Sequence, residues 1–256
     1  MNIVVCLKQT FDTEAKINLT SDGKIDDKGV TRVINPYDEY AVEEGLKLKE
    51  KFGGEVTILS LGGEKVQESM RTALAMGADK GVLIQDPALE QADEWMVAEV
   101  LAKAISQMPW DIILAGRIAV DYQSAQVAVR LAEAMNVPSV SSILTMDAEE
   151  DKAVVTREID GGTEVIEVPL PAVFTAQKGL NEPRYPSMMG IMKAKNKELK
   201  VLSFADLGIT EELKSKSSEP VYSLQSARKA GVIIQGEPAD SARELVRLLN
   251  EEAKAI

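Results

Sequence analysis

NPYDEYAVEEGLKLKEKFGGEVTILS, residues Asn35–Ser60, is the stretch that decides the fold of this chain. It predicts one helix followed by one buried strand. Asn35 stands at the expected N-cap, and Pro36 stands at the first helical position, where the ring presets φ and no N–H is needed. Gly53-Gly54 ends the helix, and the apolar run Val56–Ser60 predicts the strand. The expected inner face of the helix consists of Ala41, Val42, Gly45 and Leu46.

The same alternation of strand and helix extends on both sides of this stretch. The other expected strands of the pattern are Asn2–Leu7, Val82–Gln85, Asp111–Ala115 and Pro171–Thr175. The other expected helices are Glu64–Met76, Asp93–Met108 and Gln123–Met135. Strands that alternate with helices indicate an α/β fold, a Rossmann-like parallel sheet with helices on both faces. Ligands of such sheets bind beyond the carboxyl ends of the strands.

A small antiparallel β extension is expected after the parallel strands. Its strands are Ser139–Met146, Ala153–Glu158 and Thr163–Val168, and Asp160-Gly161-Gly162 supplies the turn between the last two. Together with the parallel sheet, this extension completes an expected nucleotide-binding domain over residues 1–205.

Residues 206–256 are expected to form a C-terminal arm. Glu212–Tyr222 is charged and contains serines, which indicates a linker. A short strand is expected at Val232–Gln235 and a closing helix at Ser241–Ala253.

Composition excludes several classes of protein. The chain has 256 residues, of which 45% are apolar and 27% are charged, so it can form a full core. Its net charge of -12 argues against nucleic-acid binding, which needs a basic surface. Histidine is absent and Cys6 is the one cysteine, which excludes histidine catalysis, common zinc sites and disulfides. We therefore expect a binder or carrier with no catalytic residue and no metal.

Neither a membrane span nor a signal peptide is expected. No run of about 18 apolar residues occurs, and the N-terminal MNIVVCLKQT lacks the apolar core of a signal peptide. A single cysteine fits a reducing compartment. These features predict a cytoplasmic protein of bacterial type that does not insert into membranes.

The strongest local signal is DIILAGRIAVDYQSAQVAVRLAEAMN, residues Asp111–Asn136. It predicts a strand, a short loop and a helix. Free amides at the start of that helix would suit a phosphate, and Gly116 would let a ligand approach the backbone closely. An ordinary corner between strand and helix, with Asp121 or Ser124 as the N-cap, explains the same residues as well.

Three further segments are expected at the same edge of the sheet. They are Leu7-Lys8 and Ser60-Leu61-Gly62 at strand ends, and Asn35-Pro36-Tyr37 at a helix start. Together they predict an adenine-nucleotide cleft, although Lys8 is equally explained as a solvated charge. No GxGxxG follows the first strand and no GxxxxGK(S/T) occurs, so we expect a structural nucleotide that is not hydrolysed.

Several motifs resemble the β subunit of electron transfer flavoproteins. They are NPYDEYAVEEGLKLKE, AGRIAVD…AQV, REIDGG and, most specifically, LNEPRY…IMKAK, and the likeness covers nearly the whole chain. The resemblance implies an adenine nucleotide alpha hydrolase-like fold. It also implies a heterodimer in which an α subunit carries most of the FAD site and this chain buries AMP. The implied AMP-site residues are Leu7, Lys8, Asn35, Pro36, Tyr37, Ser60, Gly62, Ala119, Asp121, Ser124, Gln126 and Val127.

The resemblance further implies which residues meet other proteins. Glu158 would pair with an arginine of the FAD domain, and residues 206–256 would contact the α subunit. Residues 180–198 form the implied recognition loop, which docks flavin-dependent dehydrogenases such as the acyl-CoA dehydrogenases of fatty acid β-oxidation. The electrons would then pass to a membrane quinone reductase. The implied docking residues are Tyr185, Met188, Met189, Ile191, Lys193 and Lys195.

Methionine suits an anchor because its flexible side chain enters pockets of different shape. The resemblance implies that Met188 is the apolar anchor of the loop, whose composition shows no clear helical or strand period before its end. The alternative, that the methionines pack in a core, applies best to Met192.

The nucleotide itself has two candidates. Bifurcating members of the family, which use NADH, carry D-G-D-T-A-Q-V and bind a second FAD in place of AMP. Here Asp121–Val127 reads DYQSAQV, and the bulky Tyr122 would narrow the path for a flavin. We therefore favour AMP; the alternatives are the bifurcating type and a stand-alone nucleotide-hydrolysing enzyme of the same fold.

Overall fold

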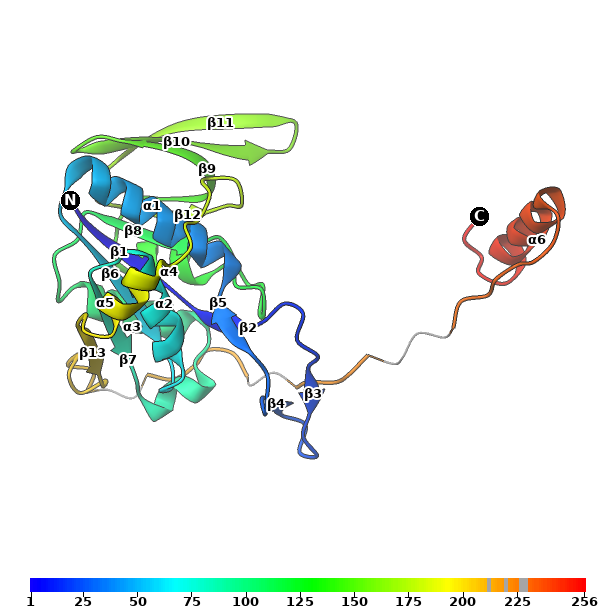
Figure 1. Cartoon of the computed structure of the whole chain (residues 1–256), viewed down its shortest axis with the longest axis horizontal. Helices are drawn as coiled ribbons and strands as arrows, with labels where there is room; N and C mark the ends of the chain where they lie inside the picture. The colour runs from blue at the N-terminus through cyan, green and yellow to red at the C-terminus, as the bar shows by residue number, and fades with distance from the viewer. Residues whose placement is uncertain (211–212, 219–220, 226–229) are drawn as a thin grey trace. The chain divides into compact units, whose positions relative to one another are not determined.

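The computed structural model describes residues 1–210, 213–218, 221–225 and 230–256. The chain divides into two units, Met1–Ile17 with Asp26–Val221 and Asn18–Ile25 with Tyr222–Ile256. The first unit is built around one sheet of nine strands that carries helices on both faces (Figure 1). The α/β fold expected from the sequence is confirmed.

The sheet joins a parallel part to an antiparallel part. Its strands are β1 (Asn2–Cys6), β6 (Glu55–Leu61), β7 (Lys80–Ile84), β8 (Ile112–Gly116), β9 (Ser139–Ala148), β10 (Lys152–Ile159), β11 (Gly162–Pro169), β12 (Ala172–Ala176) and β13 (Leu199–Leu202). Their order is β11-β10-β9-β12-β8-β1-β6-β7-β13. The strands from β9 to β13 in this order pair in parallel, whereas β9, β10 and β11 pair antiparallel. The expected antiparallel extension is therefore confirmed, and it continues the main sheet through β9.

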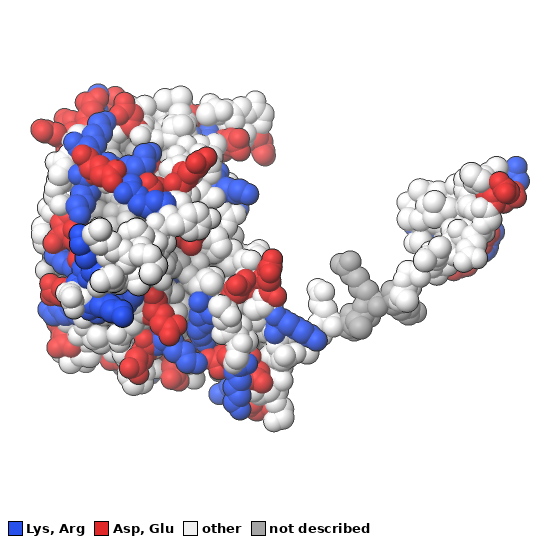
Figure 2. All heavy atoms as spheres, viewed as in Figure 1, with Lys and Arg blue, Asp and Glu red and all other residues white. Residues whose placement is uncertain are grey.

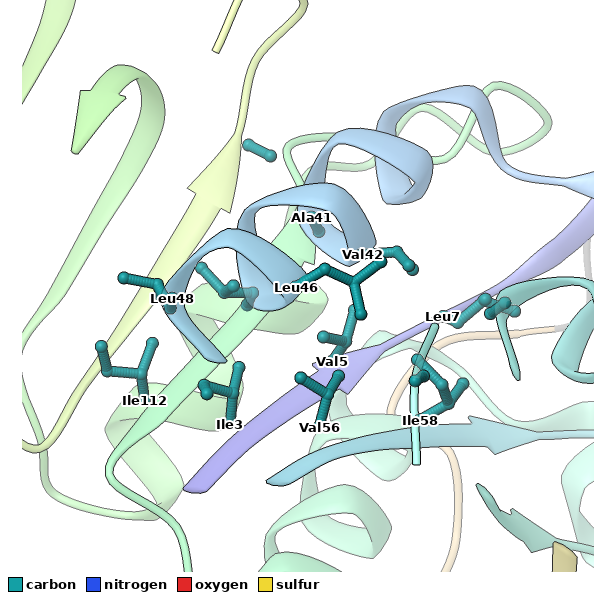
Figure 3. Packing of buried hydrophobic residues seen from close by; sticks show 14 of the residues in the cluster. Ile3, Val5, Leu7, Ala41, Val42, Leu46, Leu48, Val56, Ile58 and Ile112 are labelled. Atoms are coloured by element: carbon teal, nitrogen blue, oxygen red, sulfur yellow. The ribbon is translucent and has the colours of Figure 1, made fainter. Parts of the chain in front are cut away.

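Helices cover both faces of the sheet. They are α1 (Pro36–Phe52), α2 (Val66–Met76), α3 (Glu94–Ile105), α4 (Val127–Ala134) and α5 (Met188–Ala194), with a 3₁₀ turn η1 (Pro87–Gln91) before α3. Successive side chains of a strand point to opposite faces. Val5 therefore packs with Leu46 of α1 (Figure 3), whereas the adjacent Val4 packs in a second cluster with Leu101 of α3. Each such buried aliphatic side chain contributes about 1.5–3 kcal/mol to stability.

The sequence missed some short elements. β2 (Gln9–Phe11) pairs with β5 (Arg32–Ile34), and β3 (Asn18–Leu19) pairs with β4 (Ile25–Asp26). The loop expected at 180–195 contains a short helix, α5, in its second half. Ser187 starts this helix by accepting a hydrogen bond from the Gly190 N–H at 3.0 Å.

The second unit contains the closing helix α6 (Pro238–Glu251), which begins three residues before the expected Ser241. The strand expected at Val232–Gln235 is wrong. A strand needs a neighbour to pair its backbone groups, and both Val232 and Ile233 are exposed. The linker expected at Glu212–Tyr222 lies partly outside the described residues. Among the helices that the structure describes, none has the length and apolar character needed to cross a membrane.

Candidate functional site

Asn35 connects the start of α1 to the loop that follows β8. It occupies the N-cap position, as expected, but its side chain does not cap the helix. Its amide nitrogen instead donates to the Ile118 carbonyl at 2.9 Å and to Asp38 Oδ1 at 3.0 Å. Its amide oxygen accepts from the Val120 N–H at 3.1 Å. Because Asn35 is buried, these bonds fix the loop against α1.

Asp38 is a buried carboxylate in the first turn of α1. It accepts hydrogen bonds from the Lys8 N–H at 2.7 Å and the Gly116 N–H at 2.9 Å. Burial raises the pKa of Asp38 to about 7, although the bonds from Lys8, Asn35 and Gly116 act in the opposite direction. A single carboxylate therefore ties the ends of β1 and β8 to the first turn of α1.

Gly116 lies against the first turn of α1. A Cβ at this position would lie 2.2 Å from Asp38 Oδ1 and 2.8 Å from the Tyr37 carbonyl carbon. The first turn of α1 therefore occupies the space beside Gly116. Gly116 thus makes room for this helix, and the approach of a ligand to its backbone stays a prediction.

Neither Asp121 nor Ser124 caps α4, so that expectation is also wrong. The helix begins at Val127 and has no side-chain cap. Gln123 and Ala125 take φ values of 55° and 54°, in the left-handed region. Since consecutive helical residues need negative φ, the helix starts four residues after the expected Gln123.

Lys8 and Asp121 close the loop between β8 and α4 onto the end of β1. Lys8 Nζ donates to Asp121 Oδ1 at 2.8 Å and lies 4.5 Å from the centroid of the Tyr122 ring. The same carboxylate oxygen accepts from the Tyr122 N–H at 2.8 Å. Lys8 is thus a paired charge rather than a freely solvated one.

The remaining expected cleft residues lie at neighbouring element ends. Ser60 Oγ donates to the Leu7 carbonyl at 2.6 Å, which joins the ends of β6 and β1. Gly62 follows β6, and its N–H donates to the Ile84 carbonyl at 3.0 Å. The Gln126 side chain is used by Arg130, whose Nη2 donates to Gln126 Oε1 at 2.7 Å. Pro36 and Tyr37 start α1, Val127 starts α4, and Ala119 and Ser124 are half-buried in the connecting loop.

The structure thus brings Leu7, Lys8, Asn35, Ser60 and Asp121 into one edge of the sheet through direct contacts. Asn35 and Lys8 meet through the Asn35 N–H, which donates to the Lys8 carbonyl at 2.9 Å. No such contact joins Ser124, Gln126 or Val127 to them.

The segment before α5 is held by α1. Arg184 binds Glu43 through Nε at 2.8 Å and Nη2 at 2.9 Å, and it reaches Glu50 through Nη1 at 2.6 Å. Asn181 Nδ2 donates to the Tyr40 carbonyl at 3.0 Å. Acidic side chains of α1 therefore fix the backbone that leads into the expected docking residues.

The segment after α5 is held by α2 through two reciprocal contacts. Arg71 Nη1 donates to the carbonyls of Ala194 at 2.6 Å and Lys197 at 2.7 Å. Lys197 Nζ in turn donates to the carbonyls of Leu74 at 2.9 Å and Ala78 at 2.5 Å. Arg71 thereby satisfies carbonyls at and just after the end of α5, and Lys197 satisfies carbonyls near and just after the end of α2, where positive charge is favoured.

The outer surface of this held segment is apolar. Tyr185 is 95% exposed, Met188 79% and Met192 68%, so the expectation that Met192 packs in the core is wrong. Met189 and Ile191 are exposed as well, and so are Lys193 and Lys195. Figure 2 shows uncharged surface over α5, beside charged side chains over α1. An exposed apolar patch rimmed by charge is typical of a protein interaction site.

Glu158 lies on β10, which is three strands from β8 in the sheet. It is exposed and faces Thr163 across the β10–β11 ladder. Its neighbour Arg157 is already paired with Glu164 at 2.7 Å. Among the residues that the structure describes, no cation pairs with Glu158.

Known proteins resemble this chain along its whole length. Residues 22–207 match the family model described as "Electron transfer flavoprotein domain". The chain is 45% identical over 258 residues to "Electron transfer flavoprotein subunit beta" of Bacillus subtilis, with 100% of both chains covered. It is 46% identical over 255 residues to the protein of the same name from Syntrophomonas wolfei, covering 99% of this chain and 98% of that one. It is 36% identical over 260 residues to "Caffeyl-CoA reductase-Etf complex subunit CarD" of Acetobacterium woodii, covering 98% of this chain and 99% of that one.

Proposed function

This chain belongs to the electron transfer flavoprotein β-subunit family, and on that premise we propose that it is the platform of a heterodimer, which holds AMP, supports the FAD domain and docks the electron donor. Membership itself makes the chain an electron carrier subunit that works with an α subunit and a flavin. When bound, FAD supplies the electron-carrying chemistry.

The start of α4 is the observation that carries the AMP proposal. The N-cap residue Gln126 makes no side-chain hydrogen bond to the first N–H groups of this helix. Such free amides, together with the helix dipole, favour a phosphate. The Asn35 and Asp38 network orders the loop that leads to them, which supports a site formed before the ligand arrives. Lys8 and Asp121 would lie beside the nucleotide as polar groups.

The side chains around the cleft support a structural nucleotide rather than a reacting one. Burial and the neighbouring Asp38 raise the pKa of the Cys6 thiol to about 12, so it stays protonated and a poor nucleophile. Both carboxylate oxygens of Asp38 accept hydrogen bonds from N–H donors. These features favour a chain that binds and positions but does not catalyse.

Tyr122 favours AMP over a second FAD. Its side chain is 58% exposed, and its ring lies against the Lys8 ammonium. A flavin is larger than an adenylate and would have to displace this ring or pass beside it. We propose that the Lys8–Tyr122 contact restricts the cleft to the smaller nucleotide.

The exposed methionines on α5 support the docking role. The helix is held on both sides, so little conformational entropy remains to be lost when a partner binds. Its flexible apolar side chains suit the pockets of flavin-dependent dehydrogenases, acyl-CoA dehydrogenases among them. We propose that Glu158 pairs with an arginine of the FAD domain, that residues 206–256 contact the α subunit, and that electrons leave for a quinone reductase.

The nucleotides released from the purified heterodimer test this function. We expect FAD and AMP in equal amounts, identified by absorbance and mass spectrometry, and no nucleotide turnover by this chain. FAD alone, at twice the amount, would support the bifurcating alternative, and turnover of an added nucleotide would support the hydrolase.

A further inference from the structure

Residues 213–217 form a short strap that lies against the start of α3. Leu213 is partly buried and packs against the second apolar cluster, the one that contains Leu101 of α3. The Ser215 hydroxyl donates to the Gln91 carbonyl and accepts from the Asp93 N–H at 3.0 Å. The strap and the start of α3 thus meet although Ser215 and Asp93 are 122 residues apart in the sequence.

Asp93 makes two kinds of contact at the start of α3. Its Oδ1 caps the helix by accepting from the Met96 N–H at 2.9 Å. Its Oδ2 accepts from the strap, from the Lys216 N–H at 2.5 Å and from the Ser217 N–H at 2.9 Å. Although burial acts in the opposite direction, these N–H donors hold the pKa of Asp93 below its ordinary value. One charged carboxylate therefore holds both the helix and the strap, through hydrogen bonds of the stronger, charge-assisted kind.

The Lys216 side chain adds a contact of a different type. Its Nζ lies 4.4 Å from the centroid of the Trp95 ring, in the first turn of α3, which is within the range of a cation–π interaction. Hydroxyl, backbone and ammonium groups of the strap therefore all bind the same helix start. An ordinary surface connection needs few such contacts, because water satisfies its backbone groups.

The chain changes character directly after the strap. Val221, Leu224, Val232 and Ile233 are large apolar residues, and all of them are exposed. None of the residues of α6, all of which the structure describes, is buried. Exposed apolar side chains gathered in this way indicate a surface that another chain covers. The strap therefore lies where the packed chain ends and this exposed arm begins.

We propose that Asp93 and Ser215 are positioning residues for assembly, which anchor the root of the C-terminal arm to α3 so that the arm meets the α subunit from a fixed starting point. The inference rests on the proposed function, which assigns residues 206–256 to the α subunit, and it adds how the arm is presented. A residue that is ordered before association does not have to be ordered by it, so the anchored strap strengthens binding.

Asp93→Asn in the full-length chain tests the anchor selectively. Asparagine caps a helix as well as aspartate does, so α3 keeps its start. The new NH₂ group would instead face the N–H donors of Lys216 and Ser217, which releases the strap. Asp86→Asn is the matched control, because Asp86 caps η1 through its side chain, but its other oxygen accepts from the Phe204 N–H rather than from the strap.

Two serines of one segment provide a second matched pair. Ser215→Ala removes the hydroxyl that bonds to Gln91 and Asp93. Ser218→Ala removes an exposed hydroxyl that takes no part in these contacts. Ser215→Thr retains the hydroxyl and should restore the behaviour of the wild type.

Each variant is studied by two measurements. Hydrogen exchange in the full-length chain shows whether the strap is held, and dilution of the heterodimer gives its Kd. In Asp93→Asn and Ser215→Ala, we expect exchange of the Lys216 and Ser217 amides to be about tenfold faster. The Kd should rise about fivefold or more, because the longer free arm must be ordered on association. Both controls should match the wild type.

The outcomes separate the inference from the proposed function. If the Kd of both anchor variants stays within twofold of the wild type, or if exchange of the strap is unaltered, the inference is overturned while the proposed function stands. An equal rise of the Kd in Asp86→Asn or Ser218→Ala would also overturn it, since the effect would not be specific to the anchor. If the wild-type chain does not bind the α subunit at all, both are wrong. Should Asp93→Asn not fold, as judged by circular dichroism, Ser215→Ala carries the test.

Discussion

Arg184 and Glu43 form a bidentate pair between segments 141 residues apart in the sequence. The two nitrogens Nε and Nη2 lie 2.8 Å and 2.9 Å from the two oxygens of a carboxylate that is nearly buried. Such fork-to-fork contacts fix orientation as well as distance. The apolar surface of α5 therefore has a position relative to α1 that is set before any partner binds.

Arg184→Gln should release this segment and destabilise the fold. The substitution leaves the Glu43 carboxylate nearly buried without its partner, which should lower the free energy of unfolding by roughly 1–3 kcal/mol. Urea unfolding measures this change. Arg243→Gln is the control, because its ion pair with Asp240 on α6 is exposed and should contribute roughly 0.5 kcal/mol or less. Equal effects of the two substitutions on the free energy of unfolding would contradict the role of the Arg184–Glu43 pair in holding this segment.

Gly116→Ala should disturb the expected nucleotide cleft through steric overlap with the first turn of α1. The new methyl group would overlap Asp38 Oδ1 and the Tyr37 backbone, so α1 must shift at a cost of roughly 1–3 kcal/mol. Thermal melting should show the loss, and AMP content should fall with it. Gly63→Ala provides the comparison, since a Cβ there meets no atom within 4 Å. A normal melting temperature for Gly116→Ala would mean that α1 adapts without cost.

We expect the free energy of unfolding to depend on pH because of Asp38. Its pKa in the folded protein is about 7, above the ordinary value of 3.8, so the folded state binds this proton more tightly than the unfolded state. The contribution of Asp38 to the free energy of unfolding is therefore greatest below pH 3.8. It decreases as the pH rises toward about 7 and is constant above that. Asp38→Asn should abolish this part of the slope in urea unfolding measured across the interval.

The same substitution should also lower stability above that interval. An amide would turn an NH₂ group toward one of the N–H donors of Lys8, Gly116 and Asn35, at a cost of roughly 1–3 kcal/mol. Asp147→Asn, at an exposed position in a surface ion pair, is the control for the loss of one negative charge. An unaltered pH slope in Asp38→Asn would mean that another group titrates.

Met188→Ala should weaken docking without affecting the flavin. Loss of an apolar anchor raises the concentration of heterodimer at which electron transfer from the dehydrogenase is half-maximal, by about tenfold for a loss of roughly 1.4 kcal/mol. FAD and AMP contents should remain at wild-type levels. Val129→Ala, another exposed apolar position but on α4, should change nothing. Unaltered electron transfer in the Met188 variant would exclude the anchor role.

Asp121→Ala should reduce AMP retention. It removes the partner of Lys8 and frees the loop that the pair closes. The AMP released per heterodimer should fall severalfold, while Asp147→Ala, which breaks an exposed pair with Lys51, should leave it unchanged. A full complement of AMP in the Asp121 variant would mean that the nucleotide lies elsewhere.

The sequence alone predicted most of the longer helices and strands of the first unit, because hydrophobic periodicity and the stop signal at Gly53-Gly54 are local properties. It also indicated the antiparallel extension and the edge of the sheet where a ligand is expected. It missed the short strands β2, β5 and β13. It failed for α5, whose Ser187 cap precedes a helix of only seven residues, too short to show a period. It failed for α4 as well, since Gln123 and Ala125 adopt left-handed backbone conformations that their residue types do not favour.

The contacts between polar groups depend on the tertiary structure. Asp38 and Glu39 are adjacent acids in the first turn of α1, yet Asp38 is buried beneath three N–H donors and Glu39 is half-buried beside it. The packing of the sheet places Arg184 beside Glu43, whereas the Nε atom of Arg117 is buried without a partner among the described residues. Periodicity specifies the face of a helix on which a residue lies, but its partners come from distant segments that the packing of the sheet brings together.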